Sequence, residues 1–336
     1  MQAGRIGVER VDRHAAGVHV LELRDRDERA RQLAARADLQ EPTARRAVLL
    51  DQVERLGRQA LRVVEPARVR TACVGEQHGP PVPADRYKDA FADENAPRPP
   101  SFDEEDVSDK PPWISDMSRF SEDDISSIDT LYRNRLGTML SVDEMVNSLI
   151  RELKKEGQLD NTFIFFASDN GFLMGQHRIQ NDKRYPYEES VRTPLFVRGP
   201  GVPAGAKVED LVANTDFAPT IADLAGASVS SADGRSLAPL LRGEDPSWRS
   251  AILLEEFQRP NKKRSLPPYE AIRTETNKYV EYATGDKELY DLQADPYELD
   301  NVYESADPSL VAELKTRLDA LKSCVGEGCR ETEDGA

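Results

Sequence analysis

Two oxygen-bearing side chains stand directly after a short apolar run and are the strongest candidates for chemistry in this sequence. The run, residues 162–167, is Thr-Phe-Ile-Phe-Phe-Ala, and Asp169 and Asn170 follow it. Ligands collect at the carboxyl ends of strands in open α/β sheets, so this position favours a site. A carboxylate beside a carboxamide offers hard oxygen donors, which suit Ca²⁺ or Mg²⁺ better than zinc. Because Asn-Gly also favours a tight turn, a purely structural turn is the alternative.

Cationic side chains gather in the loop that follows. Ahead of the next apolar segment it contains His177, Arg178, Lys183, Arg184 and Arg192. Cations beside an acidic metal site are typical of a site in which a metal-bound anion, such as sulfate or phosphate, is held by Lys and His. A further histidine, His78, lies in a His-Gly-Pro-Pro segment. A lone loop histidine is more often structural than catalytic, so its role depends on its surroundings.

The elements that must position these side chains follow from hydrophobic periodicity. Between residues 123 and 157, apolar residues recur at mostly helical intervals, which predicts one long amphipathic helix. We expect Asp123 or Asp124 to cap it and Gly157 to end it. Residues 162–167 suit a strand covered on both faces of a parallel sheet, and residues 194–197 a second strand. Helix, buried strand, loop and strand in this order favour an α/β fold.

The first 75 residues differ in composition from the rest. They contain 15 Arg against 11 Asp and Glu, but no aromatic residue and no lysine, whereas the whole 336-residue chain has a net charge of -16. One interpretation is a short strand around residues 18–23 followed by amphipathic helices over residues 30–64. The other is that the segment has a different origin from the rest of the chain. The prolines that follow, over residues 80–112, predict an extended surface loop.

Composition also excludes several classes of function. A strongly negative net charge argues against binding to a nucleic-acid backbone. No stretch approaches the roughly 20 apolar residues of a membrane span. The first 13 residues carry five charged side chains and lack an apolar run, so we expect no export signal.

Together, the motifs resemble the sulfatase family. The resemblance runs from about residue 77 to residue 330 and includes a segment similar to the glucosamine-6-sulfatase-like branch near residues 101–111. It rests on these strings: Ala167-Ser168-Asp169-Asn170-Gly171, Gly175-Gln176-His177-Arg178, Arg198-Gly199-Pro200-Gly201, Asp216-Phe217-Ala218-Pro219-Thr220 and Glu288-Leu289-Tyr290-Asp291-Leu292. It implies an alkaline-phosphatase-like α/β fold: a mixed sheet with flanking helices, incomplete at its N-terminal side, plus a small C-terminal α+β subdomain.

The resemblance assigns expected roles one residue at a time. Asp169 and Asn170 match the family's late pair of calcium ligands, and Lys183 matches the lysine that holds a sulfate oxygen. His78 resembles the histidine that contacts the sulfate and protonates the leaving alcohol. His177 is expected to contact substrate or the site wall, with a loop-ordering hydrogen bond as the alternative. The implied substrate is a sulfated sugar or an aryl sulfate.

One departure from the family concerns the nucleophile. Sulfatases use a formylglycine made from the Cys of a Cys-x-Pro-x-Arg segment, and none of Cys73, Cys324 and Cys329 has that context. Two ligands also fall short of the roughly six to eight oxygens that Ca²⁺ prefers. We therefore expect little or no turnover from this chain alone. The alternatives are a non-catalytic fragment or a module that binds sulfated glycans, and another metal-dependent member of the superfamily such as a phosphodiesterase.

The expected organisation has three parts. Residues 1–75 form an atypical segment, residues 76–245 a partial sulfatase α/β domain, and residues 246–330 a C-terminal subdomain with a hairpin and a closing helix. Without cover from residues 1–75, the sheet would be left with an exposed edge. Cys324 and Cys329 are close enough in sequence for a small disulfide loop, with two free thiols as the alternative. Such a disulfide and the family resemblance both lean towards an exported protein.

Overall fold

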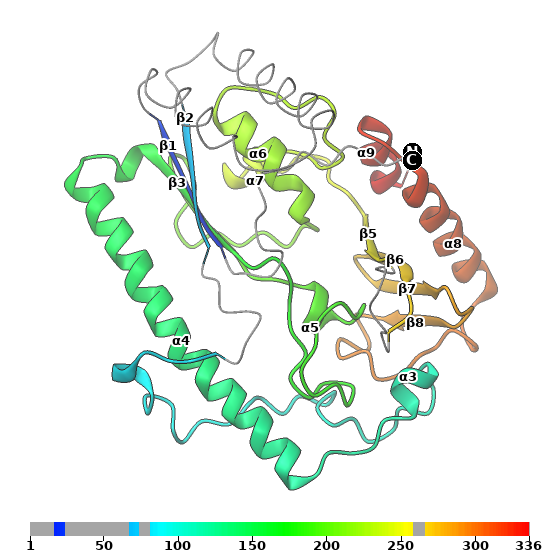
Figure 1. The fold of residues 1–336 in the computed structure, drawn as a ribbon. Coiled ribbons are helices and arrows are strands. Elements are labelled where there is room, and N and C mark those ends of the chain that lie inside the picture. The colour runs from blue at the N-terminus through cyan, green and yellow to red at the C-terminus, as the bar shows by residue number, and fades with distance from the viewer. Residues whose placement is uncertain (1–16, 24–66, 74–80, 258–265, 336) are drawn as a thin grey trace, which may run out of the picture.

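The computed structural model describes residues 17–23, 67–73, 81–257 and 266–335, and these contain two four-stranded sheets. Figure 1 shows the long helix α4 (Glu122–Lys155) along one side of the molecule and helix α8 (Pro308–Ser323) on the other, with both sheets between them. The remaining helices are short: η1 (Asp85–Tyr87), α3 (Pro112–Ser115), η2 (Leu159–Asn161), α5 (Glu188–Val191), η3 (Asn214–Asp216), α6 (Phe217–Leu224), α7 (Ala238–Leu241) and α9 (Glu327–Asp334). No helix among the described residues is long and apolar enough to cross a membrane.

The first sheet has the order β2-β1-β3-β4. It combines two strands from the first 75 residues with two strands from residues 162–198. Its strands are β1 (Gly17–Leu23), β2 (Ala67–Cys73), β3 (Thr162–Ala167) and β4 (Leu195–Arg198). The strand expected around residues 18–23 is therefore confirmed. It pairs with β3 from Gly17 opposite Ala167 to Glu22 opposite Thr162, so residues of the first 75 cover that edge of β3. The helices expected over residues 30–64 lie outside the described residues.

The parallel neighbours expected for β3 are wrong within this sheet. Both β1 and β4 pair with β3 in the antiparallel sense. The prediction used the continuous apolar run of β3, whose side chains are buried or half-buried on both faces. Burial on both faces shows that other layers cover the sheet above and below. It does not determine whether the adjacent strands run parallel or antiparallel.

Helix α4 has the length and the C-terminus that its periodicity predicts. Its last turn carries Lys154 and Lys155, and Gly157 ends it with a φ of 64°. The expected cap is wrong by two or three residues, because Ser121 is the N-cap and accepts a hydrogen bond from the Asp124 backbone N–H. Asp124 instead completes a capping box. The C-terminal half of α4 packs on β3 through Met145, Val146, Leu149, Ile150 and Leu153.

The second sheet is an antiparallel meander of β5 (Ala251–Glu256), β6 (Tyr269–Thr274), β7 (Asn277–Tyr282) and β8 (Lys287–Asp291). The predicted hairpin is confirmed as β6 and β7, and the predicted closing helix as α8. Helix α8 packs its buried leucines Leu314, Leu318 and Leu321 against the apolar residues of this sheet.

A shared core joins the second sheet to the loop that carries the candidate site. Tyr185 and Tyr187 of the loop lie in one hydrophobic cluster with Tyr282 and Tyr290 of the sheet. Glu288 is fully buried at its centre, and its carboxylate accepts hydrogen bonds from the hydroxyls of Tyr187, Tyr282 and Tyr290 at 2.6–2.9 Å. Three phenolic donors replace the water that this carboxylate loses. The core crosses the expected boundary at residue 246, so the sheet supports the site loop directly.

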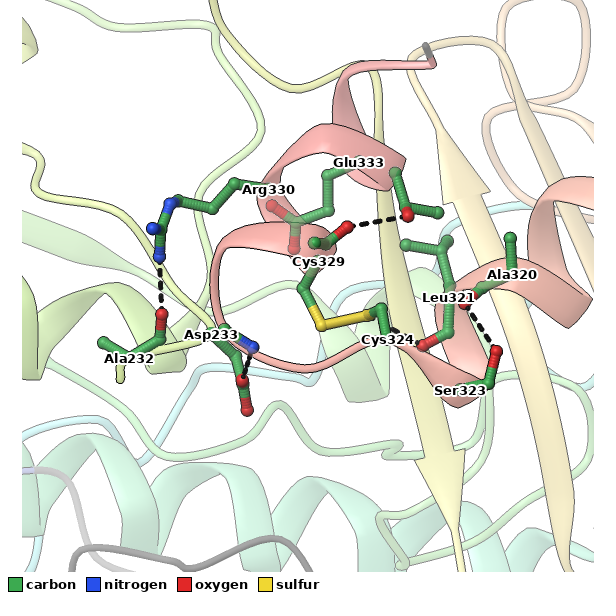
Figure 2. Close-up of a disulfide and its surroundings, with 12 residues drawn as sticks. Ala232, Asp233, Ala320, Leu321, Ser323, Cys324, Cys329, Arg330 and Glu333 are labelled. Carbon is green, nitrogen blue, oxygen red and sulfur yellow. Dashed lines mark hydrogen bonds between the residues drawn. A yellow bond between two sulfur atoms is a disulfide. The ribbon is translucent and has the colours of Figure 1, made fainter. Parts of the chain in front are cut away.

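Cys324 and Cys329 form a disulfide, with Cα atoms 4.8 Å apart. Figure 2 shows that it joins the end of α8 to α9, whose Arg330 donates a hydrogen bond to the carbonyl oxygen of Ala232 at 2.6 Å. The backbone N–H of Gly326 donates to Asp233 at 2.7 Å. The disulfide therefore holds α9 where it can contact the loop before α7.

Candidate active site

The loop after β3 places Asp169 and Asn170 at the end of the buried strand. The Ser168 hydroxyl donates to the carbonyl oxygen of Asn170 at 2.8 Å, and the Asn170 Nδ2 donates to the carbonyl oxygen of Gly171 at 2.8 Å. Asn214 adds a bond from its Nδ2 to the Asp169 carbonyl oxygen at 3.0 Å. These bonds hold the backbone of the half-buried Asp169 in a fixed turn.

Gly171 allows this turn to lie against the start of α5. Its N–H donates to the carbonyl oxygen of Ser190 at 2.8 Å, and the next N–H, of Phe172, donates to the carbonyl oxygen of Glu189 at 2.8 Å. A Cβ at Gly171 would lie 2.0 Å from the Glu189 carbonyl oxygen. Only glycine permits this approach, because the obstructing atoms belong to a backbone.

Lys183 lies within electrostatic reach of Asp169. Burial raises the pKa of Asp169, and the charge of Lys183 opposes this rise. Burial lowers the pKa of Lys183, the charge of Asp169 opposes that shift, and Arg135 and Arg184 add to it. Among the described residues, the Lys183 ammonium has no hydrogen-bond or ion-pair partner. The lysine is therefore a half-buried cation available to an anion.

Arg135 is a third charged residue near Asp169 and Lys183, and the sequence did not lead us to predict it. It comes from α4, and its guanidinium carbon lies 3.8 Å from the centre of the Phe172 ring. A signal was present in the sequence, because Arg135 stands seven residues from both Ile128 and Val142, which are buried on α4. Seven residues are about two helical turns, so Arg135 shares their face of the helix.

His177 is fully buried and held between two carboxylates. Its Nδ1 lies 2.7 Å from a Glu104 oxygen and its Nε2 lies 3.6 Å from a Glu189 oxygen. Its ring stacks on Tyr187 with centroids 4.0 Å apart, and its backbone N–H donates to the Ser101 carbonyl oxygen at 2.7 Å. The expected contact with substrate is not seen, because the ring has no exposed surface. The geometry agrees with the alternative, a hydrogen bond that orders the loop.

Protonation of His177 is expected to stabilise the fold most in mild acid. Burial by itself lowers the pKa of His177, and Lys110 acts in the same direction, but the Glu104 and Glu189 carboxylates outweigh them and raise it. A raised folded-state pKa gives stability that is fully present below the unfolded value of about 6.5 and lost as pH rises through the folded value. Each unit of increase is worth roughly 1.4 kcal/mol.

Urea unfolding of the parent chain and His177→Gln between pH 5.5 and pH 9 tests this expectation. The stability difference between the two chains should shrink as pH rises. A difference that stays constant over this range would show that folding leaves the pKa of His177 unchanged, and one that grows with pH would show that folding lowers it.

The Asp169 and Asn170 oxygens fit part of a calcium site. They are hard donors, and the carboxylate sits where burial disfavours its charge, which a bound cation would offset. Within the ranges that the structure describes, no group of three or more His, Cys, Asp or Glu side chains could hold a metal. Asp169 and Asn170 by themselves supply a minority of the roughly six to eight oxygens that Ca²⁺ takes. His78 lies outside the described residues.

Two family profiles match this chain over overlapping ranges. The profile described as sulfatase matches residues 60–227, and the profile described as N-sulphoglucosamine sulphohydrolase, C-terminal, matches residues 175–324. The N-acetylglucosamine-6-sulfatase of Bos taurus is 34% identical over 288 residues, which are 75% of this chain and 51% of the relative. This chain spans about half the length of the curated relatives it matches.

Solved structures with a similar fold extend the comparison. A protein solved in complex with its substrate D-glucosamine-2-N,6-O-disulfate has a TM-score of 0.65 and 26% identity, covering 76% of this chain and 65% of that one. The phosphonate monoester hydrolase of Agrobacterium radiobacter has a TM-score of 0.52 and 33% identity, covering 57% of this chain and 42% of that one.

Proposed function

Since this chain belongs to the sulfatase family, and has the alkaline-phosphatase-like α/β fold expected for it, we propose that it binds the sulfate group of a sulfated sugar beside a calcium ion. The observation that carries the proposal is the placement of Lys183, a half-buried ammonium without a described partner, close to Asp169. A glucosamine sulfate is the favoured ligand. A named relative is an N-acetylglucosamine-6-sulfatase, and a structural neighbour holds a glucosamine disulfate.

Each proposed role follows from the chemistry of the side chain. Asp169 and Asn170 would hold the calcium ion, which when bound polarises the sulfate oxygens and stabilises their charge. Lys183 donates a charge-assisted hydrogen bond to a sulfate oxygen. His78 is proposed as the acid that protonates the leaving alcohol. The loop-ordering contacts of His177 keep the segment that carries Lys183 in place.

Turnover needs a nucleophile in line with the leaving oxygen, and the 336 residues contain no Cys-x-Pro-x-Arg segment from which formylglycine is made. We therefore propose that these residues by themselves bind sulfate esters and hydrolyse them poorly. A module that binds sulfated glycans without cleaving them is the alternative form of the same proposal. The disulfide between Cys324 and Cys329 favours an oxidising, exported setting.

The test combines binding and turnover. Isothermal titration of glucosamine 6-sulfate in the presence of Ca²⁺ is expected to show binding that Lys183→Met weakens about tenfold, the effect of losing one charge-assisted hydrogen bond. Lys207→Met, which removes an exposed lysine, is the matched control and should leave the affinity unchanged. Turnover of an aryl sulfate should stay near the background rate. Rapid aryl sulfate turnover would refute the proposed inactivity, and equal affinities for all three chains would refute the site.

Hydrolysis of phosphonate or phosphate esters is a second candidate, favoured by the 33% identity to the phosphonate monoester hydrolase. A sulfate monoester and a phosphonate monoester each carry one negative charge, so charge alone does not separate them and their affinities must be compared directly. Parallel titrations with phenyl sulfate and a phenyl phosphonate monoester separate the two candidates. Tighter binding of the phosphonate would favour the second.

A further inference from the structure

Arg135 points from α4 towards the loop that carries the proposed calcium ligands. Its guanidinium lies over the face of Phe172, which follows Asn170 by two residues. The backbone of Phe172 is itself fixed, because its N–H donates to the Glu189 carbonyl oxygen at 2.8 Å. The aromatic face therefore sets the plane in which the guanidinium lies.

Among the residues that the structure describes, other buried or half-buried arginines have partners that the Arg135 guanidinium lacks. Arg249 pairs with Asp216, and Arg178 donates to three backbone carbonyl oxygens. The Nε of Arg135 is buried without a hydrogen-bond partner, and no ion pair joins its guanidinium to another described residue. Removing a cation from water without a counter-charge is costly, so this position indicates an anion that binds there.

Lys183 is a second cation near Arg135, and it supports the binding of an anion there. Leu173 and Asp182 form an antiparallel bridge with backbone hydrogen bonds of 2.8 and 3.3 Å, which sets Phe172, the residue under Arg135, beside Lys183. The charge of Arg135 adds to the lowering of the Lys183 pKa, in agreement with this placement. Both lose hydration by burial, and burial also lowers the pKa of Arg135. Two partly buried cations that repel each other are stabilised together by one anion between them.

We propose that Arg135 and Lys183 bind the same sulfate group, with Arg135 donating from the planar edge of its guanidinium. This inference rests on the proposed function and adds to it a specific binding residue on α4. An arginine at this position offers two parallel N–H donors to a tetrahedral oxyanion, whereas a lysine offers a single point charge. The aromatic face of Phe172 orients that planar group before the ligand arrives, which lowers the entropy cost of binding.

The experiment measures inorganic sulfate binding to the full chain by isothermal titration, with Ca²⁺ present and with sodium chloride keeping the ionic strength constant. Arg135→Met is expected to weaken sulfate binding about tenfold, and Arg135→Lys to weaken it by less. Arg133→Met is the matched control, because the Arg133 guanidinium donates instead to the Glu94 carbonyl oxygen and to Thr130. Its sulfate affinity should equal that of the parent. Since Met and Lys are good helix formers, circular dichroism should show α4 intact in all three variants.

The outcomes separate this inference from the function on which it rests. If Lys183→Met weakens sulfate binding and Arg135→Met does not, the role of Arg135 is refuted and the proposed function stands. If Arg133→Met weakens binding as much as Arg135→Met, the effect is general electrostatics and the specific site on α4 is refuted. If the parent chain binds no sulfate, both proposals fail.

Discussion

Asp216→Ala is expected to lower the free energy of unfolding by about 3–5 kcal/mol, because it leaves a fully buried arginine without its main counter-charge. Asp216 and Arg249 both have no exposed side-chain surface. The two guanidinium Nη atoms donate to the two carboxylate oxygens at 2.6 and 2.7 Å. This is a bidentate pair, the geometry that makes an arginine–carboxylate contact strongest.

The carboxylate of Asp216 also organises the local backbone. It accepts hydrogen bonds from the N–H of Ala213 at 2.8 Å and from the N–H of Arg235 at 2.9 Å. After the substitution, the ion pair that Arg249 keeps within the described part of the chain is that of its Nε with Glu333, at 2.9 Å. Both backbone donors lose their partner as well, so the cost includes unsatisfied polar groups in addition to the lost ion pair.

Urea unfolding followed by circular dichroism measures this cost. Glu244→Ala is the matched control, since it removes a carboxylate that also lies 2.6 Å from an arginine nitrogen, that of Arg242, where both side chains are about half exposed. A surface pair of this kind contributes roughly 0–1 kcal/mol. If the two substitutions cost the same, burial of the Asp216–Arg249 pair has no energetic consequence and the argument fails.

Gly171→Ala is expected to destabilise the chain by about 3 kcal/mol and to abolish the calcium binding proposed for Asp169 and Asn170. The new Cβ would lie 2.0 Å from the Glu189 carbonyl oxygen and 2.8 Å from its carbonyl carbon. Neither atom can move away as a side-chain tip would, because α5 begins at Glu188 and Phe172 bonds to the same oxygen. The loop must shift, and both candidate ligands shift with it.

Gly328→Ala is the control for this substitution, because a Cβ there meets no atom within 4 Å. Gly328 lies inside α9, where alanine is favoured over glycine by roughly 0.5–1 kcal/mol, so this variant should be slightly more stable than the parent. Titration with Ca²⁺ and urea unfolding of both variants give the two readouts. Normal calcium affinity in Gly171→Ala would show that the turn tolerates the displacement and that its close packing does not position the ligands.

The features that could be predicted from the sequence are those that depend on residues close together along the chain. The spacing of apolar residues and the glycine stop predict α4, since an amphipathic helix needs only its own stripe and caps. Residues 271–273 and 279–282 likewise predict the hairpin of β6 and β7. The motif after β3 also predicts that Asp169, Asn170 and Lys183 belong to one neighbourhood, which the electrostatic coupling of Asp169 with Lys183 supports.

Contacts between segments far apart in the sequence became known only from the folded structure. His177 looks like a ligand-contacting loop histidine until Glu104, 73 residues earlier, encloses it. Arg135 meets Phe172, and Asp216 meets Arg249, only in the folded chain. The parallel direction predicted for the strands beside β3 was wrong for the same reason. Local patterns report how much of a side chain is buried, whereas its chemical role depends on partners that the chain brings together only by folding.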